Sequence, residues 1–70
     1  MTDSDIALFI QMNEPTFDYG GKQYSVCSPD GMYSTWDSDG NTFDFSDIGS
    51  LLDRWVVGGR PFRDVVQTIM

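Results

Sequence analysis

Apolar residues recur with helical spacing in residues 4–13, near the start of this 70-residue chain. The residues that follow intervals of three and four are Ile6, Phe9 and Ile10. This spacing predicts a helix that is capped by Ser4 or Asp3 and buries one face. Because short apolar runs are ambiguous, a buried strand over the same residues is the alternative interpretation.

From residue 16 to residue 45 the apolar residues alternate with polar ones, which is typical of strands. Three turn signals divide this segment into four strands. Gly20-Gly21 is expected to form a two-residue hairpin loop, which pairs Phe17 with Tyr24.

The next two turns define the register of the third and fourth strands. Pro-Asp-Gly at residues 29–31 predicts a three-residue loop that places Trp36 opposite Tyr24. Asp-Gly at residues 39–40 predicts a two-residue type I′ turn that pairs Trp36 with Phe43. With these loops, all three turns agree on one buried face. It contains Phe17, Tyr24, Val26, Met32, Trp36, Phe43 and Phe45.

Helical spacing returns after residue 45. Ser46 is expected to cap a helix that frays at residues 56–57 and ends at Gly58-Gly59. Pro61 suits the first position of a last helix. The apolar stripes of the two helices are Ile48, Leu51, Leu52 and Trp55, followed by Phe62, Val65, Val66 and Ile69.

Together these elements predict a single small α+β domain over residues 1–70. An N-terminal helix is followed by a four-stranded antiparallel meander with one face covered by helices, and then by two C-terminal helices (α-β-β-β-β-α-α). A chain of this size buries roughly 60% of its unfolded surface, which is enough for one core and no more.

The chain is acidic, with eleven Asp and Glu residues against four Lys and Arg residues and a net charge of −7. Nucleic-acid binding requires cations that neutralise phosphates, so we expect no direct binding to nucleic acid. Attachment to an anionic membrane is disfavoured for the same reason. The first residues are polar and acidic and do not resemble a signal peptide, so we expect a cytoplasmic protein.

The composition also argues against catalysis. The chain has no histidine, which is the commonest general base and metal ligand in proteins. Cys27 is the only cysteine, so it has no disulfide partner within the chain and no histidine to activate its thiol. We therefore expect no enzyme activity and no cofactor.

In the predicted register, the face of the sheet that is turned away from the helices carries three carboxylates, one tyrosine and no cation. These candidate partner-binding residues are Asp18, Asp37, Asp44 and Tyr33. The simplest interpretation is a solvated face whose charge keeps the protein soluble. The alternative is a surface that docks a basic partner protein, with the tyrosine as its anchor.

Asp37, Asp39 and Asn41 form a weak candidate metal site, because they resemble the first half of a calcium-binding loop. However, Thr42 and Ile48 stand where such a loop requires glycine and glutamate. An Asp-Gly hairpin turn explains the same residues without a metal ion.

The remaining cations near the C-terminus are Arg54, Arg60 and Arg63, too few for a phosphate-binding surface. We expect them to pair with acids of the chain itself. Asp64 lies four residues after Arg60 and is one possible partner.

Three stretches carry a resemblance, namely residues 16–26 (TFDYGGKQYSV), 44–48 (DFSDI) and 58–66 (GGRPFRDVV). They resemble short uncharacterised proteins of phages and mobile elements of Gram-positive bacteria, which have no assigned activity. The resemblance implies a source in which small acidic proteins act by binding host machinery.

The leading hypothesis is therefore a small acidic protein-binding module that docks a basic partner through its open sheet face. An inhibitor that mimics nucleic acid is a special case. One alternative is a structural, homodimeric protein that pairs through its first strand, Thr16–Tyr19, because a small core gains from association. A weak calcium-binding module is the other.

Overall fold

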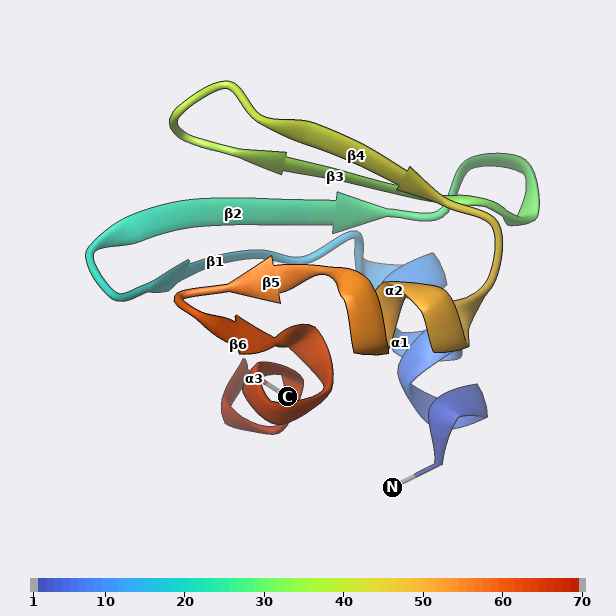
Figure 1. Cartoon of the computed structure of the whole chain (residues 1–70). Coiled ribbons are helices and arrows are strands. Elements are labelled where there is room, and N and C mark those ends of the chain that lie inside the picture. Colours follow the sequence, from blue (N-terminus) through green and yellow to red (C-terminus); the bar gives the residue numbers. More distant parts are fainter. Residues whose placement is uncertain (1, 70) are drawn as a thin grey trace.

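The computed structural model describes residues 2–69 and has the predicted α+β architecture (Figure 1). A helix precedes the four strands, so the helical interpretation of residues 4–13 is confirmed. In chain order the elements are α1 (Asp3–Asn13), β1 (Thr16–Tyr19), β2 (Lys22–Cys27), the 3-10 turn η1 (Pro29–Gly31), β3 (Tyr33–Asp37), β4 (Thr42–Phe45), α2 (Ile48–Arg54), β5 (Val56–Val57), β6 (Arg60–Pro61) and α3 (Phe62–Ile69).

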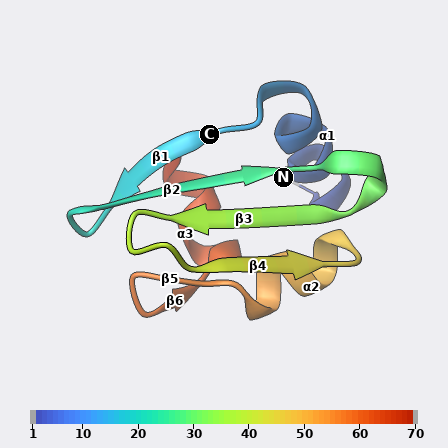
Figure 2. The same cartoon turned by 90° about the horizontal axis from the view of Figure 1, so that it is seen from above.

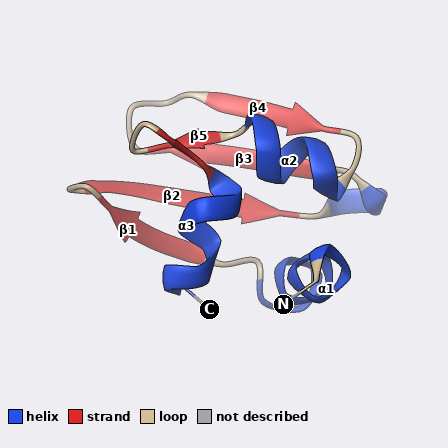
Figure 3. Cartoon of the chain, turned by 60° about the horizontal axis from the view of Figure 1, so that its bottom comes forward, coloured by secondary structure: helices blue, strands red, loops and turns tan. Residues whose placement is uncertain are grey.

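The molecule has two layers. Strands β1-β2-β3-β4 form one antiparallel sheet in sequence order, and the three helices with the β5–β6 ribbon lie against one of its faces (Figures 1 and 3). The core between the layers includes an aromatic cluster in which Phe62 stacks on Phe17 and tilts against Trp55. The buried apolar residues are Ile6, Ile10, Phe17, Tyr24, Val26, Tyr33, Leu51, Leu52, Trp55, Val57, Phe62, Val65 and Val66.

The cap of α1 lies one or two residues earlier than expected. Thr2, and not Ser4 or Asp3, is the N-cap, since its hydroxyl accepts a hydrogen bond from the Asp5 amide at 3.2 Å. The Asp5 carboxylate accepts one in return from the Thr2 amide, which completes a capping box. Neither Ser4 nor Asp3 can take this role, because both are already inside the first turn.

The first hairpin has the predicted register. Gly20 and Gly21 both have positive φ and form the two-residue loop, and Phe17 pairs with Tyr24. The rings of this pair stack with centroids 5.5 Å apart on the inner face of the sheet.

The second hairpin is shifted by one residue from the prediction. Asp30 and Gly31 have φ values of 52° and 80°, and the Met32 amide donates to the Pro29 carbonyl at 2.9 Å. This is the two-residue primed turn that Asp-Gly favours, instead of the three-residue loop expected there. As a result Tyr24 pairs with Asp37 and not with Trp36.

The third hairpin is also shifted by one residue, because its loop is one residue longer than predicted. Gly40 has positive φ and its amide donates to the Asp37 carbonyl, which makes a three-residue loop of residues 38–40. The Asp37 carboxylate accepts the Asp39 and Asn41 amides, and these bonds fix the longer loop. Trp36 therefore pairs with Thr42 and not with Phe43.

The first shift turns β3 over, and the second adds to it, so that β4 is displaced by two residues and returns to the predicted face. Phe43 and Phe45 are on the predicted face of the sheet, although Phe43 is exposed there. The predicted core positions Trp36 and Met32 are wrong, since both side chains are exposed. The inward residues of β3 are Tyr33, Thr35 and Asp37.

The segment after β4 also differs from the prediction at three points. Asp47, and not Ser46, caps α2, because its Oδ1 atom accepts the Ser50 amide at 2.7 Å. Gly58-Gly59 does not end a helix but turns the β5–β6 ribbon, in which residues 56–57 pair with residues 60–61. Pro61 belongs to β6 and not to the first turn of a helix, so α3 begins one residue later, at Phe62. Of the predicted stripe, α3 buries Phe62, Val65 and Val66, and Ile69 is partly buried.

Arg63 of α3 joins the three helices through two ion pairs. Its Nη1 atom lies 2.8 Å from Asp3 Oδ1 on α1, and its Nε atom lies 2.7 Å from Asp53 Oδ1 on α2. The predicted pairing of arginines with the chain's own acids is confirmed for this residue. No Arg60–Asp64 ion pair forms within residues 2–69. No helix in this range is long and apolar enough to cross a membrane.

Candidate functional site

The candidate site is the face of the four-stranded sheet that the helices leave uncovered, which we call the open face (Figure 2). Because side chains alternate along each strand, the observed registers assign its residues. They are Thr16, Asp18, Gln23, Ser25, Cys27, Ser34, Trp36, Thr42 and Asp44.

The structure divides the four predicted partner-binding residues into two pairs. Asp18 and Asp44 are exposed on the open face, as expected. Asp37 and Tyr33 are wrongly placed by the prediction, because the shifted registers turn both toward the helices and leave them 6% and 8% exposed. Neither can contact a partner on the open face.

Trp36 takes the place that the prediction gave to Tyr33. It lies on the central strand β3, between Ser25 of β2 and Thr42 of β4, and its side chain is 40% exposed. A neighbouring row places Ser34 beside Asp44, where the serine hydroxyl donates to the carboxylate at 2.8 Å. Among the described residues, no Lys or Arg lies on this face.

Asp37 is instead a structural group of the β3–β4 loop. Its carboxylate accepts the Asp39 amide at 2.9 Å, the Asn41 amide at 3.1 Å and the Asn41 side-chain amide at 3.2 Å. Burial acts to raise the pKa of Asp37, but these hydrogen bonds and the nearby Lys22 ammonium outweigh it and lower the pKa. The residue is thereby held as a carboxylate inside the fold.

The same loop accounts for the candidate metal ligands Asp37, Asp39 and Asn41. Lys22 Nζ lies 2.7 Å from the Asp39 carboxylate and 3.4 Å from that of Asp37, so an ammonium group occupies the space between the two acids. The hydrogen bond to Asp39 is the main reason that the pKa of Lys22 is raised. The part of the chain that the structure describes contains no group of three His, Cys, Asp or Glu residues suited to a metal ion.

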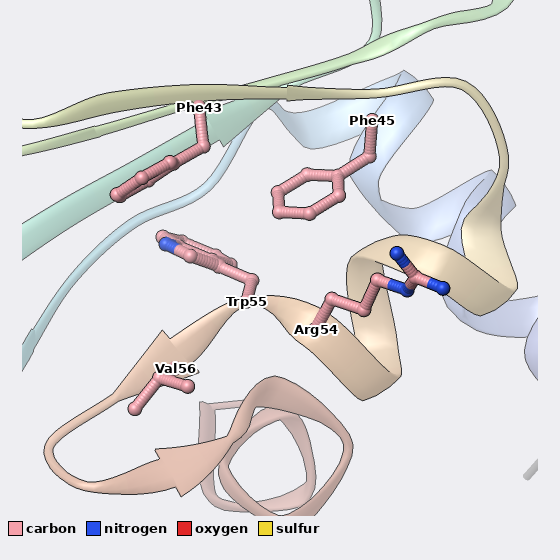
Figure 4. Close-up of a pocket in the computed structure, with 5 residues that line it drawn as sticks. All are labelled: Phe43, Phe45, Arg54, Trp55 and Val56. Carbon is pink, nitrogen blue, oxygen red and sulfur yellow. The ribbon is translucent and has the colours of Figure 1, made fainter.

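A second surface lies on the helical side of β4, where a groove separates this strand from the end of α2 and the start of the β5–β6 ribbon (Figure 4). The groove has a volume of about 240 Å³. Its lining residues are Phe43, Phe45, Arg54, Trp55 and Val56. Phe43 is 52% exposed and Val56 is 61% exposed, so the groove opens to solvent.

The sequence pattern does not indicate this groove, because the groove depends on the β5–β6 ribbon, and the pattern predicts a frayed helix end at residues 56–57 instead. The one sequence feature that points to the groove is the pair Phe43 and Phe45 on the last strand of the meander. An edge strand has no neighbouring strand on one side to cover such residues. Comparison of the chain with known protein families, curated proteins and solved structures finds no match.

Proposed function

We propose that this protein is a small protein-binding module that docks a basic partner through its open face. The observation that carries the proposal is the exposed Trp36 side chain at the centre of a face that bears carboxylates and no cation. Tryptophan is among the residues that contribute most to binding when they become buried in an interface.

Charge supports a basic partner over an acidic one. The chain carries −7 overall, and Asp18 and Asp44 stand on the outer strands on either side of Trp36. A positively charged surface would approach such a face faster than a neutral one, and like-charged surfaces would be repelled. The hydroxyl groups of the surrounding Ser and Thr residues supply hydrogen-bond donors and acceptors for a polar rim.

An inhibitor that occupies the nucleic-acid groove of a basic host protein is a special case of this function. The acidic face and the resemblance to proteins of phages and mobile elements support it. In that case, partner binding weakens steeply with salt, since charge pairs across the interface are screened.

The test is a salt-gradient pull-down from a lysate of the cells that encode the chain. Wild-type protein is compared with Trp36→Ala and with the double variant Asp18→Lys/Asp44→Lys. The matched control is Asp30→Lys/Asp64→Lys, which changes the charge equally at exposed acids outside the open face. Circular dichroism confirms that each variant is folded.

We expect a basic protein that the wild type and the control retain and that both open-face variants lose. Equal capture by all four proteins would remove the open face from the function. If the pull-down recovered no protein and sedimentation showed a concentration-dependent dimer, the homodimeric alternative would be favoured.

A further inference from the structure

The outer edge of β4 has unpaired backbone groups. Asp37 N donates to Asn41 O at 3.0 Å, which marks that pair as hydrogen-bonded across β3 and β4. In an antiparallel ladder the bonded pairs recur every second residue, so Phe43 and Phe45 also direct their amides and carbonyls toward β3. Those of Thr42 and Asp44 therefore point away from the sheet, and no described strand pairs with them.

The side chains beside this edge form an apolar groove. Phe43 and Phe45 project from β4 toward Trp55 and Val56, which follow α2 (Figure 4). A strand that adds to β4 would extend the sheet over this groove and place every second side chain in it. A strand added to β1, at the opposite edge of the sheet, would cover no comparable apolar groove, because Phe17 of β1 already lies in the core and is 9% exposed.

One cation marks the end of the groove near Phe45. Arg54 lies at the C-terminus of α2 with its guanidinium beside Phe45 (Figure 4), and no carboxylate lines the groove. Within residues 2–69 Arg54 has no ion pair, whereas Arg63 and Lys22 each bridge two acids. An exposed guanidinium next to apolar surface is suited to a carboxylate, which it can bind through two parallel hydrogen bonds.

We propose that the β4 edge and its groove bind an extended peptide segment of another protein. The segment pairs its main chain with Thr42 and Asp44 and places an apolar side chain between Phe43 and Val56. A carboxylate of the segment, from Asp, Glu or the chain end, binds Arg54. Thr42 and Asp44 contribute their backbone here and their side chains to the open face, and the proposal does not depend on the function proposed above.

The charges favour such a peptide over a second copy of this chain. Dimerisation through β4 would bring together two molecules that each carry −7, and pairing centred on Asp44 would set two carboxylates opposite each other. The net negative charge of the protein also disfavours a strongly acidic peptide. We therefore expect the bound peptide to carry a single carboxylate, placed at the Arg54 end of the groove. A residue paired with Asp44 would point to the open face, where a basic side chain fits.

The test begins with a displayed library of random linear peptides selected on the whole wild-type protein. Peptides are counter-selected on Val56→Asp, which places a charge in the groove at an exposed position. Leu8→Asp is the matched control, since Leu8 is an exposed apolar residue of α1 outside the groove. We expect enriched peptides that bind the wild type and Leu8→Asp equally and bind Val56→Asp weakly. A library without enrichment would overturn the proposal.

The selected peptide is then titrated into ¹⁵N-labelled protein, together with a copy in which its acidic residue is replaced by the amide. We expect changes in the backbone amide chemical shifts that are confined to residues 42–46 and 54–57. Arg54→Gln should weaken the acidic peptide about tenfold and leave the amide peptide unchanged, because a neutral side chain cannot make charge-assisted hydrogen bonds to the carboxylate. Arg60→Gln is the control, as Arg60 is exposed and outside the groove.

Methylation of alternate peptide nitrogens tests the edge itself. One alternate set of methyl groups should abolish binding, because those amides pair with β4, and the other set should be tolerated. The proposal would be overturned if both sets of methyl groups were tolerated equally, or if the acidic and amide peptides bound with equal affinity. It would also be overturned if raising the protein concentration without peptide produced the same chemical-shift changes. The last result would assign the groove to a second copy.

Discussion

The two tryptophans have opposite environments. The Trp36 side chain is 40% exposed on the open face, whereas Trp55 is 2% exposed among the rings of Phe17, Tyr24 and Phe62. The exposure of Trp36 follows directly from the register of β3, because a shift by one residue turns every side chain of a strand to the other face.

Fluorescence quenching by acrylamide therefore tests the register at a single residue. We expect Trp36→Phe to remove the easily quenched part of the emission and to leave a blue-shifted, protected signal from Trp55. If Trp36 faced the core, as the turn signals alone predicted, the substitution would leave the accessibility of the emission unchanged.

The residues of the open face show how far the sequence could predict a site. Asp18 was placed correctly because the Gly20-Gly21 loop has only one favourable length. Asp44 was placed on the correct face because two errors of one residue displace β4 by two residues, and side chains alternate with a period of two. Trp36 was missed because it lies between the two shifted turns.

At the scale of elements, the two Asp-Gly turns explain why the register could not be derived from turn residues alone. Both contain the same dipeptide, yet residues 30–31 form a two-residue loop and residues 38–40 form a three-residue loop. What separates them is the Asp37 carboxylate, which binds the amides of the longer loop. The helices were easier to predict, because their apolar spacing does not depend on a loop length.

The β5–β6 ribbon packs against the first hairpin through one glycine. A methyl group at Gly58 would meet the Tyr19 ring at 2.5 Å, whereas one at Gly59 would meet nothing within 4 Å. Both glycines have left-handed φ, at 61° and 81°. The two positions therefore share the backbone cost of alanine and differ in the steric contact.

We expect Gly59→Ala to lower the free energy of unfolding by about 1–2 kcal/mol, the cost of a left-handed conformation for alanine. Gly58→Ala should lower it further, because the Tyr19 ring must also move. Urea unfolding measures both. In a Tyr19→Ala background, Gly58→Ala should lower the free energy of unfolding by no more than Gly59→Ala does. If Gly58→Ala still lowered it further in that background, the Tyr19 ring would not be the cause of the difference.

For the whole molecule, the acidic charge is partly used to hold the fold together. The pKa values of Asp5, Asp47 and Asp53 are lowered by hydrogen bonds from Thr2, Ser50 and Arg63 respectively, as that of Asp37 is lowered in its loop. In the unfolded chain these groups return to their ordinary values near 3.8. The unfolded state therefore binds protons at a higher pH than the folded state does.

The melting temperature should consequently stay nearly constant between about pH 7 and pH 5 and fall below about pH 4, as the pH approaches the lowered folded-state values. The absence of histidine removes the usual titration in the upper range. Calorimetry from pH 7 to pH 2.5 measures the profile. A melting temperature that rises below pH 4 would mean that relief of charge repulsion outweighs the lost hydrogen bonds.

Both ends of the described chain lie on the helical side of the sheet (Figure 1). Thr2 begins α1 and Ile69 ends α3, and both helices lie beneath the strands. A protein anchored by either end, to a bead, a sensor chip or a fused reporter, therefore presents the open face outward without a linker that crosses it. The fold itself sets the orientation of the immobilised molecule.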